Sequence, residues 1–419
     1  MKAATAYKGI EAVLVDMEEG VVAELFKGPL RDIYDHRYLI TDVSGSGNNW
    51  AVGKYFYGSR YNQELIEVIR RAAELCDCLQ CFFLIHSLGG GTGSGVGTHI
   101  LKILADEYPN AYKIVTSIFP SIDDDVITSP YNTVLGLGQL TELADCVIPV
   151  DNLALASLTR PVKEKTANHK PSPTGRGAQT NQWPSAINPL NSGNSKAKPF
   201  DGMNNVVASM LLNLTSSSRF EGTMNVDLNE ISMNLVPFPR LHYLITAQSP
   251  LTTVGGSAQP RRIDQVFSDA FTRDFQLVSA DPCRHTFLAA ALLVRGKVCA
   301  SDIRRNIDKL QLRLHFVPWN REGWKVGHCL VPPIGQQYNL LALSNNTSIR
   351  NSFSAILERF YKLYKRKAHL HHYASVDGFD LQLFDTSATS LQELEKEYEE
   401  FERQTVGIPT SSLRLRIAD

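Results

Sequence analysis

A glycine-rich stretch, Gly89-Gly90-Gly91-Thr92-Gly93-Ser94-Gly95, constrains the fold of this chain more than any other segment. It follows the apolar run 81–87 and precedes a helical pattern, so we expect it to join a strand to a helix. Five glycines in seven residues remove the Cβ atoms that would keep the backbone away from a ligand. Because backbone N–H groups at a helix start attract anions, the segment predicts a phosphate-binding loop.

The spacing of these glycines excludes two common phosphate-binding motifs. A Walker loop requires Lys and then Ser or Thr after its last glycine, and the next lysine is Lys102. The dinucleotide fingerprint requires glycine at its first, third and sixth positions, and Val96 or Thr98 would occupy the sixth. A glycine-rich turn without a ligand is the remaining alternative.

Strand and helix signals alternate between residues 12 and 150. Such alternation is typical of a parallel sheet that is covered by helices on both faces. The expected strands are 12–15, 82–86, 114–119 and 146–150. The expected helices are 63–75, a segment from the glycine stretch to about residue 106, and one that starts near Ser129, where Pro130 suits the first turn.

The second half predicts a second α/β unit followed by helices. Its expected strands are 242–247, 287–294, 314–317 and 340–343, and its helices are 203–214, 226–235, 263–271 and 301–310. Helices 351–373 and 390–404 close the chain. We therefore expect an α/β fold with a parallel sheet flanked by helices, a second α/β domain and C-terminal helices. The predicted domains are 1–220, 221–349 and 350–419.

Residues 160–199 interrupt this pattern. They contain six prolines and seven basic residues against one acidic residue, with little aliphatic content. Such a segment cannot bury enough apolar surface to order itself, so we predict a disordered basic insertion. A basic arm that docks on an acidic surface is the functional alternative.

Overall composition gives no electrostatic reason for nucleic-acid or membrane binding, since the formal net charge is −1. Seven cysteines in 419 residues do not suggest a disulfide framework. The chain has no apolar run long enough to span a bilayer, and its N-terminus lacks a signal-peptide core. We expect a cytosolic protein.

The glycine loop and its flanking segments resemble the tubulin superfamily. The stretch 89–95 is a specific signature, and residues 44–51, 129–132 and 234–242 look like tubulin segments in the same order. The resemblance extends from about residue 12 to residue 373. Residues 77–81, 127–132 and the basic insertion are most similar to the epsilon-tubulin branch, which is tied to centrioles and basal bodies.

The resemblance implies that residues 1–220 bind guanine nucleotide, GTP or GDP. It assigns contacts with the phosphates to Gly47, Asn48, Asn49, Ser87, Gly90, Gly91, Thr92, Gly93 and Ser94. It assigns contacts with the ribose or base to Asp125 and Asn152, stacking on guanine to Phe200, and a base-edge contact to Asn204. An asparagine amide suits guanine because it both donates and accepts hydrogen bonds.

Two acidic residues, Asp16 and Glu18, follow the strand at 12–15. Carboxylates at a strand end can hold Mg²⁺ or its water shell near the phosphates. The alternative is an ordinary helix start, which favours acidic residues in its first turn. Without the resemblance the two interpretations are equally good.

One position departs from the family pattern. Ser129 stands where α- and β-tubulins have a ribose-contacting glutamate before Pro-Tyr-Asn. A charged partner of the sugar is therefore absent, and we expect weaker sugar contacts.

The resemblance also divides GTP hydrolysis between two molecules. It places Asp227 and Glu230 in a segment that faces the nucleotide of the neighbouring subunit. Their i, i+3 spacing puts both carboxylates on one helix face. A carboxylate there could orient or deprotonate the attacking water. Without the family context, an ordinary acidic helix start is the better interpretation.

Other clusters carry weaker signals. Cys76, Cys78 and Cys81 are three close thiols, but a closed zinc site needs four ligands. His369, His371 and His372 lie in a basic segment that we interpret as an interface or solvated face rather than a metal site. The acidic run within 393–402 predicts a solvated helix face.

The family's first strand and its Gly-Gln-x-Gly-Asn-Gln loop have no counterpart in this sequence. Because that strand lies inside the parallel sheet, its absence would leave two strand edges unpaired, or the N-terminal residues would rearrange. If the two edges stay unpaired, we expect the sequence to be that of a truncated isoform or an incomplete gene model. A glutamate-rich C-terminal tail is also absent.

The resemblance therefore predicts a GTP-binding cytoskeletal protein that contacts other tubulins and centriole or basal-body proteins. The expected locations are the cytoplasm, the centrosome, centrioles and basal bodies. The alternative is a structural or adaptor subunit that binds nucleotide poorly and does not hydrolyse it.

Overall fold

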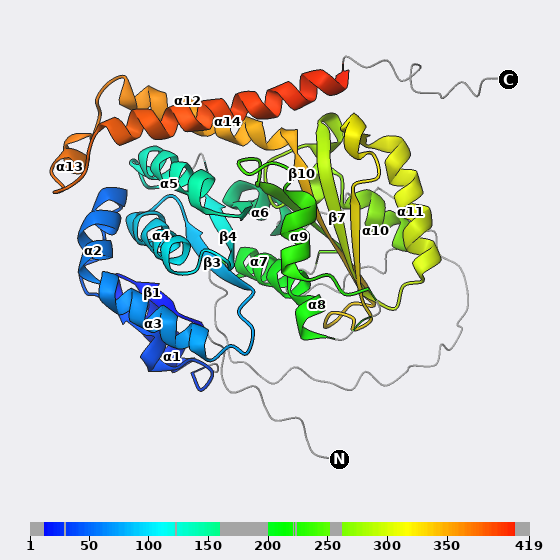
Figure 1. Ribbon diagram of the computed structural model, residues 1–419, viewed down its shortest axis with the longest axis horizontal. Helices are drawn as coiled ribbons and strands as arrows, with labels where there is room; N and C mark the ends of the chain where they lie inside the picture. The colour runs from blue at the N-terminus through cyan, green and yellow to red at the C-terminus, as the bar shows by residue number, and fades with distance from the viewer. Residues whose placement is uncertain are drawn as a thin grey trace, which may run out of the picture.

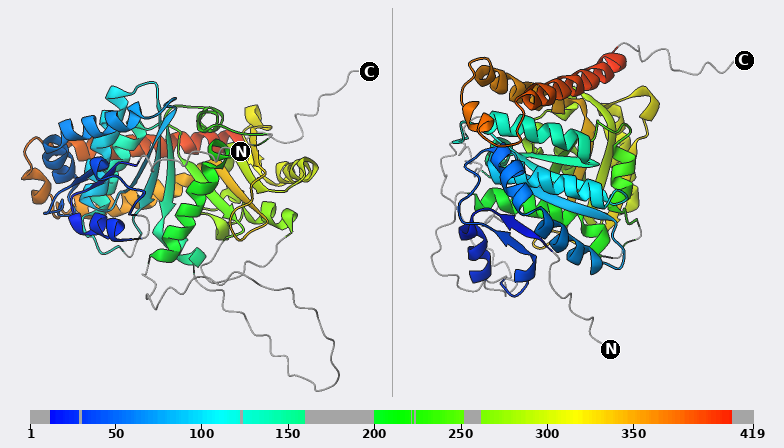
Figure 2. Two further views of the ribbon diagram at one scale, coloured as in Figure 1. Left: turned by 90° about the horizontal axis from the view of Figure 1, so that it is seen from below. Right: turned by 60° about the vertical axis from the view of Figure 1, so that its left-hand side comes forward.

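The computed structural model describes residues 12–28, 31–121, 124–159, 200–220, 222, 224–251 and 262–406. The insertion predicted at 160–199 lies outside the described residues, as do residues 1–11 and 407–419. Two α/β units lie side by side, and two long C-terminal helices run across one side of both (Figures 1 and 2).

The first unit is built on parallel strands, as the alternation predicts. Strands β3 (Cys81–Ser87), β4 (Tyr112–Phe119) and β5 (Cys146–Asp151) form one parallel sheet in that order. Strands β1 (Leu14–Asp16) and β2 (Leu39–Thr41) form a separate parallel pair. No strand among the described residues joins β1 to β3.

Helices cover both faces of the β3-β4-β5 sheet because its strands are apolar on both sides. Along β4, Val115 packs with α4 (Gly97–Glu107) and α5 (Ser129–Leu143), whereas Ile114 packs on the opposite face with α6 (Asn152–Thr159) and α7 (Asp201–Leu214). The other helical segments are α1 (Glu19–Lys27), α2 (Gly58–Arg60), α3 (Asn62–Glu74), α8 (Ser216–Arg219), the 3-10 turn η1 (His36–Tyr38) and the π-helical turns η2 (Val52–Tyr57) and η3 (Thr92–Val96).

The second unit contains a mixed sheet. Its strands run in the order β6 (Leu244–Ser249), β10 (Tyr338–Asn346), β7 (Thr286–Gly296) and β8 (His315–Phe316), and β9 (Trp324–Cys329) also pairs with β7. Strand β10 is antiparallel to β6 and β7, whereas β8 and β9 are parallel to β7. Every residue of β7 is buried, as its continuous apolar run requires.

Helices cover both faces of this second sheet as well. Helix α9 (Leu228–Leu235) packs on one face of β7, and α10 (Ile263–Asp269) and α11 (Ala300–Arg313) pack on the other. The 3-10 turns η4 (Arg273–Phe275), η5 (Pro282–Arg284) and η6 (Pro318–Asn320) connect these elements.

The C-terminal helices differ from the sequence prediction. Instead of one helix over 351–373, α12 (Arg350–Tyr364), preceded by the turn η7 (Thr347–Ile349), is separate from the short α13 (His371–Ala374). Lys367 and His369 have φ values of 50° and 59°, a left-handed conformation that a right-handed helix cannot contain. Helix α14 (Gln382–Val406) begins at Gln382 rather than Ser390.

One apolar core joins the C-terminal helices to both units. The ring of Phe360 in α12 lies 5.7 Å from Tyr131 of α5, and Phe353 lies 4.9 Å from Tyr243, next to β6. These side chains are buried together with residues of α14 such as Phe384. The helices are therefore part of the structural core and not an external addition to it.

Candidate functional site

The candidate site lies at the carboxyl edge of the parallel strands. Strand β3 leads into the glycine loop, β4 into a connection described at 120–121 and 124–128, and β5 directly into Asn152. Because parallel strands end at the same edge of a sheet, these three connections are neighbours. Open α/β sheets bind their ligands at this edge.

The glycine loop packs backbone against backbone with the segment around Gly53. A Cβ atom on Gly53 would lie 2.3 Å from the carbonyl oxygen of Gly91, and one on Gly95 would lie 2.4 Å from that of Trp50. Both segments are π-helical at this contact, in η2 and η3. Packing therefore requires glycine at these positions.

The buried side chain of Asn132 connects three segments of the site. Its Oδ1 accepts hydrogen bonds from the backbone N–H of Trp50 at 2.9 Å and from the Tyr373 hydroxyl at 2.6 Å. Its Nδ2 donates to the carbonyl oxygens of Asn48 at 2.8 Å and Gly89 at 2.9 Å. Two donors and two acceptor positions saturate the amide, so the side chain holds all three segments in one arrangement.

Residues 44–49 form a tight loop beside the glycine loop. Gly45, Gly47 and Asn48 have φ values of 63°, 57° and 53°, which glycine adopts readily and asparagine tolerates. The hydroxyls of Ser46 and Thr92 lie 2.9 Å apart. The predicted residues 47–49 therefore lie against the glycine loop.

The remaining predicted phosphate contacts lie within or under the glycine loop. A Cβ atom on Gly93 would lie 2.7 Å from the Oγ of Ser87, and one on Gly91 would lie 2.5 Å from the backbone nitrogen of Asn49. The Ser94 hydroxyl donates a hydrogen bond to the carbonyl oxygen of Gly90. The structure brings all these predicted residues together, and their contact with a nucleotide stays a prediction.

The two predicted metal ligands lie at the end of β1 beside the loop 44–49. The backbone N–H of Glu18 donates to Oδ1 of Asp16 at 3.2 Å, and a Cβ atom on Gly45 would lie 2.8 Å from Oε1 of Glu18. Burial raises the pKa of Asp16. Paired carboxylates fit Mg²⁺, which proteins bind through one or two carboxylates while it keeps several waters. Binding of Mg²⁺ stays a prediction.

A hollow of about 630 Å³ adjoins the loop 44–49. Its lining residues are Ser44, Gly45, Ser46, Gly47, Asn48, Asn49, Val52, Asp125, Val126, Ile127, Thr128, His369, His372 and Tyr373. Sequence reasoning selected Asp125 and missed Asp124, which lies closer to the glycine loop. A Cβ atom on Gly89 would lie 2.9 Å from Oδ2 of Asp124, which also accepts a hydrogen bond from the Ser129 hydroxyl at 3.3 Å. The run of three aspartates after β4 was the signal available for this position.

The residues predicted to contact the base form a second group on α6 and α7. Asn152 begins α6, and Phe200, 57% exposed, caps α7 one turn before Asn204. The two helices pack together through Leu155 and Val206. No hydrogen bond among the described residues joins this group to the glycine loop, and its role stays a prediction.

The predicted catalytic pair lies at the start of α9, in the second unit. Asp227 is the exposed N-cap residue of α9, and Glu230 is in its first turn. The Oε2 atom of Glu230 lies 2.7 Å from Nζ of Lys325 in β9. Within the described part of the chain, no hydrogen bond or ion pair joins either acidic residue to the glycine loop.

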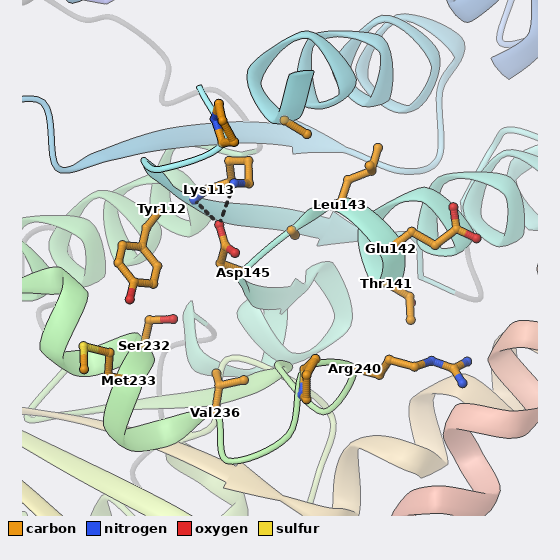
Figure 3. Close-up of a pocket in the computed structure, with 14 residues that line it drawn as sticks. Tyr112, Lys113, Thr141, Glu142, Leu143, Asp145, Ser232, Met233, Val236 and Arg240 are labelled. Carbon is orange, nitrogen blue, oxygen red and sulfur yellow. Dashed lines mark hydrogen bonds and ion pairs between the residues drawn. The ribbon is translucent and has the colours of Figure 1, made fainter. Parts of the chain in front are cut away.

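A second hollow, of about 700 Å³, lies between the first unit and α9 (Figure 3). At its wall, Asp145 accepts a hydrogen bond from the backbone N–H of Lys113 at 2.7 Å and pairs with its Nζ at 3.0 Å (Figure 3). Ser232 and Val236 of the α9 segment face it from the other side (Figure 3). None of the predicted site residues lines this hollow, so it is separate from the candidate site.

The cysteines at 76–81 and the histidines at 369–372 are the two clusters for which the sequence raised a metal site. Cys76, Cys78 and Cys81 form no disulfide among the described residues, and the rings of His371 and His372 lie 3.9 Å apart. The described residues contain no group of three or more His, Cys, Asp or Glu side chains arranged to hold a metal ion.

The sequence predicts that the acidic run of α14 is a solvated face, but some of its glutamates make contacts with the rest of the protein. Glu397 pairs with Arg240 at 2.9 Å, and Glu402 contacts His285 at 2.8 Å. These contacts attach α14 to the second unit.

Comparisons with known proteins agree with this architecture. The profile of the Tubulin/FtsZ family, GTPase domain, matches residues 5–160, and that of the Tubulin C-terminal domain matches residues 239–358. The chain is 53% identical to the tubulin epsilon chain of Homo sapiens and 52% identical to that of Mus musculus, over 97% of this chain and 85% of each relative. It is 33% identical to the tubulin beta-2 chain of Suillus bovinus, over 94% of this chain and 83% of that relative.

This chain belongs to the tubulin family. It is therefore a guanine-nucleotide-binding protein of the cytoskeleton. It is more similar to these epsilon chains than to this beta chain, which confirms the resemblance seen in the sequence. Among the described residues, no helix has both the length and the apolar character needed to cross a membrane.

We expect Gly95→Ala to disrupt the site, because the new Cβ atom would lie 2.4 Å from the carbonyl oxygen of Trp50 and no side-chain rotation can relieve that contact. The expected result is a loss of about 1–3 kcal/mol of stability and of co-purifying guanine nucleotide. Gly20→Ala in α1 is the control, since no atom lies within 4 Å of its Cβ position. Thermal unfolding and chromatography of the released nucleotide measure both effects. Equal results for the two variants would contradict the packing argument.

We expect stability to fall as the pH drops from about 6.5 towards 4, in part because of His86. Burial lowers the pKa of His86 on β3 to about 4, whereas an unfolded histidine titrates near 6.5. The unfolded chain therefore binds more protons in this range, so the contribution is complete above pH 6.5 and is lost below it. His86→Gln should reduce the slope by up to about 1.4 kcal/mol per pH unit in urea denaturation at pH 7, 6 and 5. An unchanged slope would refute this.

Proposed function

We propose that this GTP-binding tubulin-family protein assembles longitudinally with other tubulins as a structural component of centrioles and basal bodies. The identity of 53% with the human tubulin epsilon chain supports this assignment, because the resemblance seen in the sequence links the epsilon branch to those organelles. The proposed location is accordingly the centrosome, the centriole and the basal body. Centriole and basal-body proteins are proposed as further partners.

The nucleotide part of the proposal depends on one observation. Asn132 holds residues 48–50 and the start of the glycine loop together at the carboxyl edge of the sheet. In the proposed complex the phosphates lie between these two loops, and Asp16 and Glu18 hold Mg²⁺, directly or through water. Asp125 and Asn152 contact the ribose or base, and Phe200 and Asn204 contact guanine.

We assign hydrolysis to the junction between two subunits. Asp227 and Glu230 are accessible at the start of α9, where a neighbouring subunit can approach them. In the proposed step, a water oxygen bonds to the terminal phosphorus of the neighbour's GTP as the bond to the bridging oxygen breaks. GDP leaves with that electron pair, and the water proton passes to a carboxylate and then to solvent.

A structural or adaptor subunit without hydrolysis is the second candidate. Ser129 favours it, because this fully buried residue bonds to Asp124 and offers no carboxylate to the sugar. Among the described residues, no strand lies between β1 and β3, which favours it as well. Nucleotide content separates the two candidates.

The purified chain should contain close to one guanine nucleotide per molecule. Nucleotide is released with acid and quantified by chromatography against the protein concentration. Removal of Mg²⁺ with EDTA should lower the retained fraction, because the divalent ion screens the charges of the phosphates and of Asp16. A protein that is folded but empty would support the adaptor subunit instead.

Glu230→Ala should slow partner-stimulated phosphate release by about 100-fold, the lower end of what a positioned general base contributes. The assay uses GTP-loaded αβ-tubulin below the concentration at which it assembles alone, and it follows phosphate after addition of the chain. Glu358→Ala removes another glutamate that pairs with a lysine, on the more exposed surface of α12, and serves as the control. If Glu230→Ala leaves phosphate release at the control rate, hydrolysis does not depend on this carboxylate.

A further inference from the structure

Lys325 and Glu230 form an ion pair between β9 and α9. The Nζ atom of Lys325 lies 2.7 Å from Oε2 of Glu230, and the two side chains are 30% and 47% exposed. No sequence motif predicted this contact, because β9 itself was not expected. The lysine therefore touches the carboxylate to which the proposed function assigns hydrolysis.

The backbone on both sides of this pair is fixed by packing. Lys325 lies opposite Ala291 of the fully buried strand β7. Glu230 is held in α9 by the buried neighbours Leu228 and Ile231. The relative position of the lysine and the glutamate is therefore set by the sheet and the helix, not by a flexible loop.

The ion pair contributes little to stability. Pairs that are this exposed are screened by water and stabilise a fold by about 0–1 kcal/mol. Replacement of Lys325 should therefore leave the fold intact. Any large effect of that replacement must arise in the chemistry of Glu230 or in the approach of a partner.

Two consequences for Glu230 follow from the geometry. The lysine contacts Oε2 only, and no other contact of the Glu230 carboxylate is found among the described residues. Oε1 is thus available to accept a hydrogen bond from water while the lysine limits rotation of the carboxylate. The positive charge also compensates one of the two negative charges at the start of α9, which would otherwise repel an anionic phosphate.

We propose that Lys325 is a positioning residue for the hydrolysis that Glu230 carries out on the nucleotide of a neighbouring subunit. The inference rests on the proposed function and deepens it. Lys325 does not touch the nucleotide or the water. It orients the carboxylate and makes the approach of Asp227 and Glu230 to the phosphates electrostatically acceptable.

The experiment measures phosphate release from GTP-loaded αβ-tubulin, held below its own assembly concentration, as a function of added full-length chain. The variants are Lys325→Met, Lys325→Arg, Glu230→Gln and the double variant Lys325→Met/Glu230→Gln. Lys362→Met is the control, because Lys362 forms a lysine–glutamate pair of similar length with Glu358, at 2.8 Å, on the more exposed surface of α12. Thermal unfolding of each variant verifies that the fold is retained.

Lys325→Met should lower the maximal rate about tenfold, because the carboxylate loses its orientation. The half-saturating concentration should rise by no more than about twofold, because a single partly exposed charge contributes little to docking. Lys325→Arg should restore the rate to within about threefold, since the charge and reach are retained. In the Glu230→Gln background, Lys325→Met should change the rate by no more than about twofold, as expected for two groups that act as one unit. Lys362→Met should behave as the unaltered chain.

Three results would overturn the inference. One is a maximal rate for Lys325→Met equal to that of Lys362→Met. Another is an equal loss of rate from Lys325→Met in the presence and in the absence of Glu230, which would assign Lys325 an independent role. The third is a change confined to the half-saturating concentration, which would make Lys325 a docking residue. A Glu230→Gln variant as fast as the unaltered chain, or an unaltered chain that gives no stimulation, would instead refute the proposed function, and this inference with it.

Discussion

The amide of Asn132 is the contact on which the rest of the candidate site depends. It is fully buried, and its four hydrogen bonds reach the loop 44–49, the glycine loop and Tyr373. Removal of one partner would leave a polar atom unsatisfied in the interior, at a cost of about 1–3 kcal/mol. Three segments from distant parts of the sequence are thus fixed relative to one another before any ligand binds, which reduces the ordering cost of binding.

Local signals made much of the fold predictable. The apolar runs that became β3, β4, β5 and β7 and the glycine stretch that follows β3 are visible in the sequence and recur in the structure. Strand β9 was missed because its residues 324–329 mix lysine, glycine and histidine with apolar residues, so no simple period is present. The break between α12 and α13 depends on the left-handed backbone conformation of Lys367 and His369. Lysine and histidine do not indicate such a conformation in a sequence, so the break was not predicted.

The candidate site, like the fold, was predictable only where a local sequence pattern indicates a residue. The resemblance selected most of the residues that gather at the glycine loop, but it gave no reason for Gly53, whose absent side chain admits the carbonyl of Gly91. Asn132 was indicated only as the last residue of the tubulin-like segment 129–132. Contacts of this kind join residues far apart in sequence, and no local pattern encodes them. For the same reason the ion pair of Glu230 with Lys325 required the assembled sheet.

The hydrogen bond between Tyr373 and Asn132 has a consequence for the order in which the protein can be completed during synthesis. The glycine loop, residues 89–95, lies in the first part of the sequence. Tyr373, which donates one of the four hydrogen bonds of the Asn132 amide, lies 241 positions after Asn132. The aromatic core that surrounds Tyr131 likewise needs Phe360 and Phe384. Until Tyr373 has been synthesised, Asn132 therefore lacks one of its four partners, and the contacts that hold the two loops of the candidate site together are incomplete.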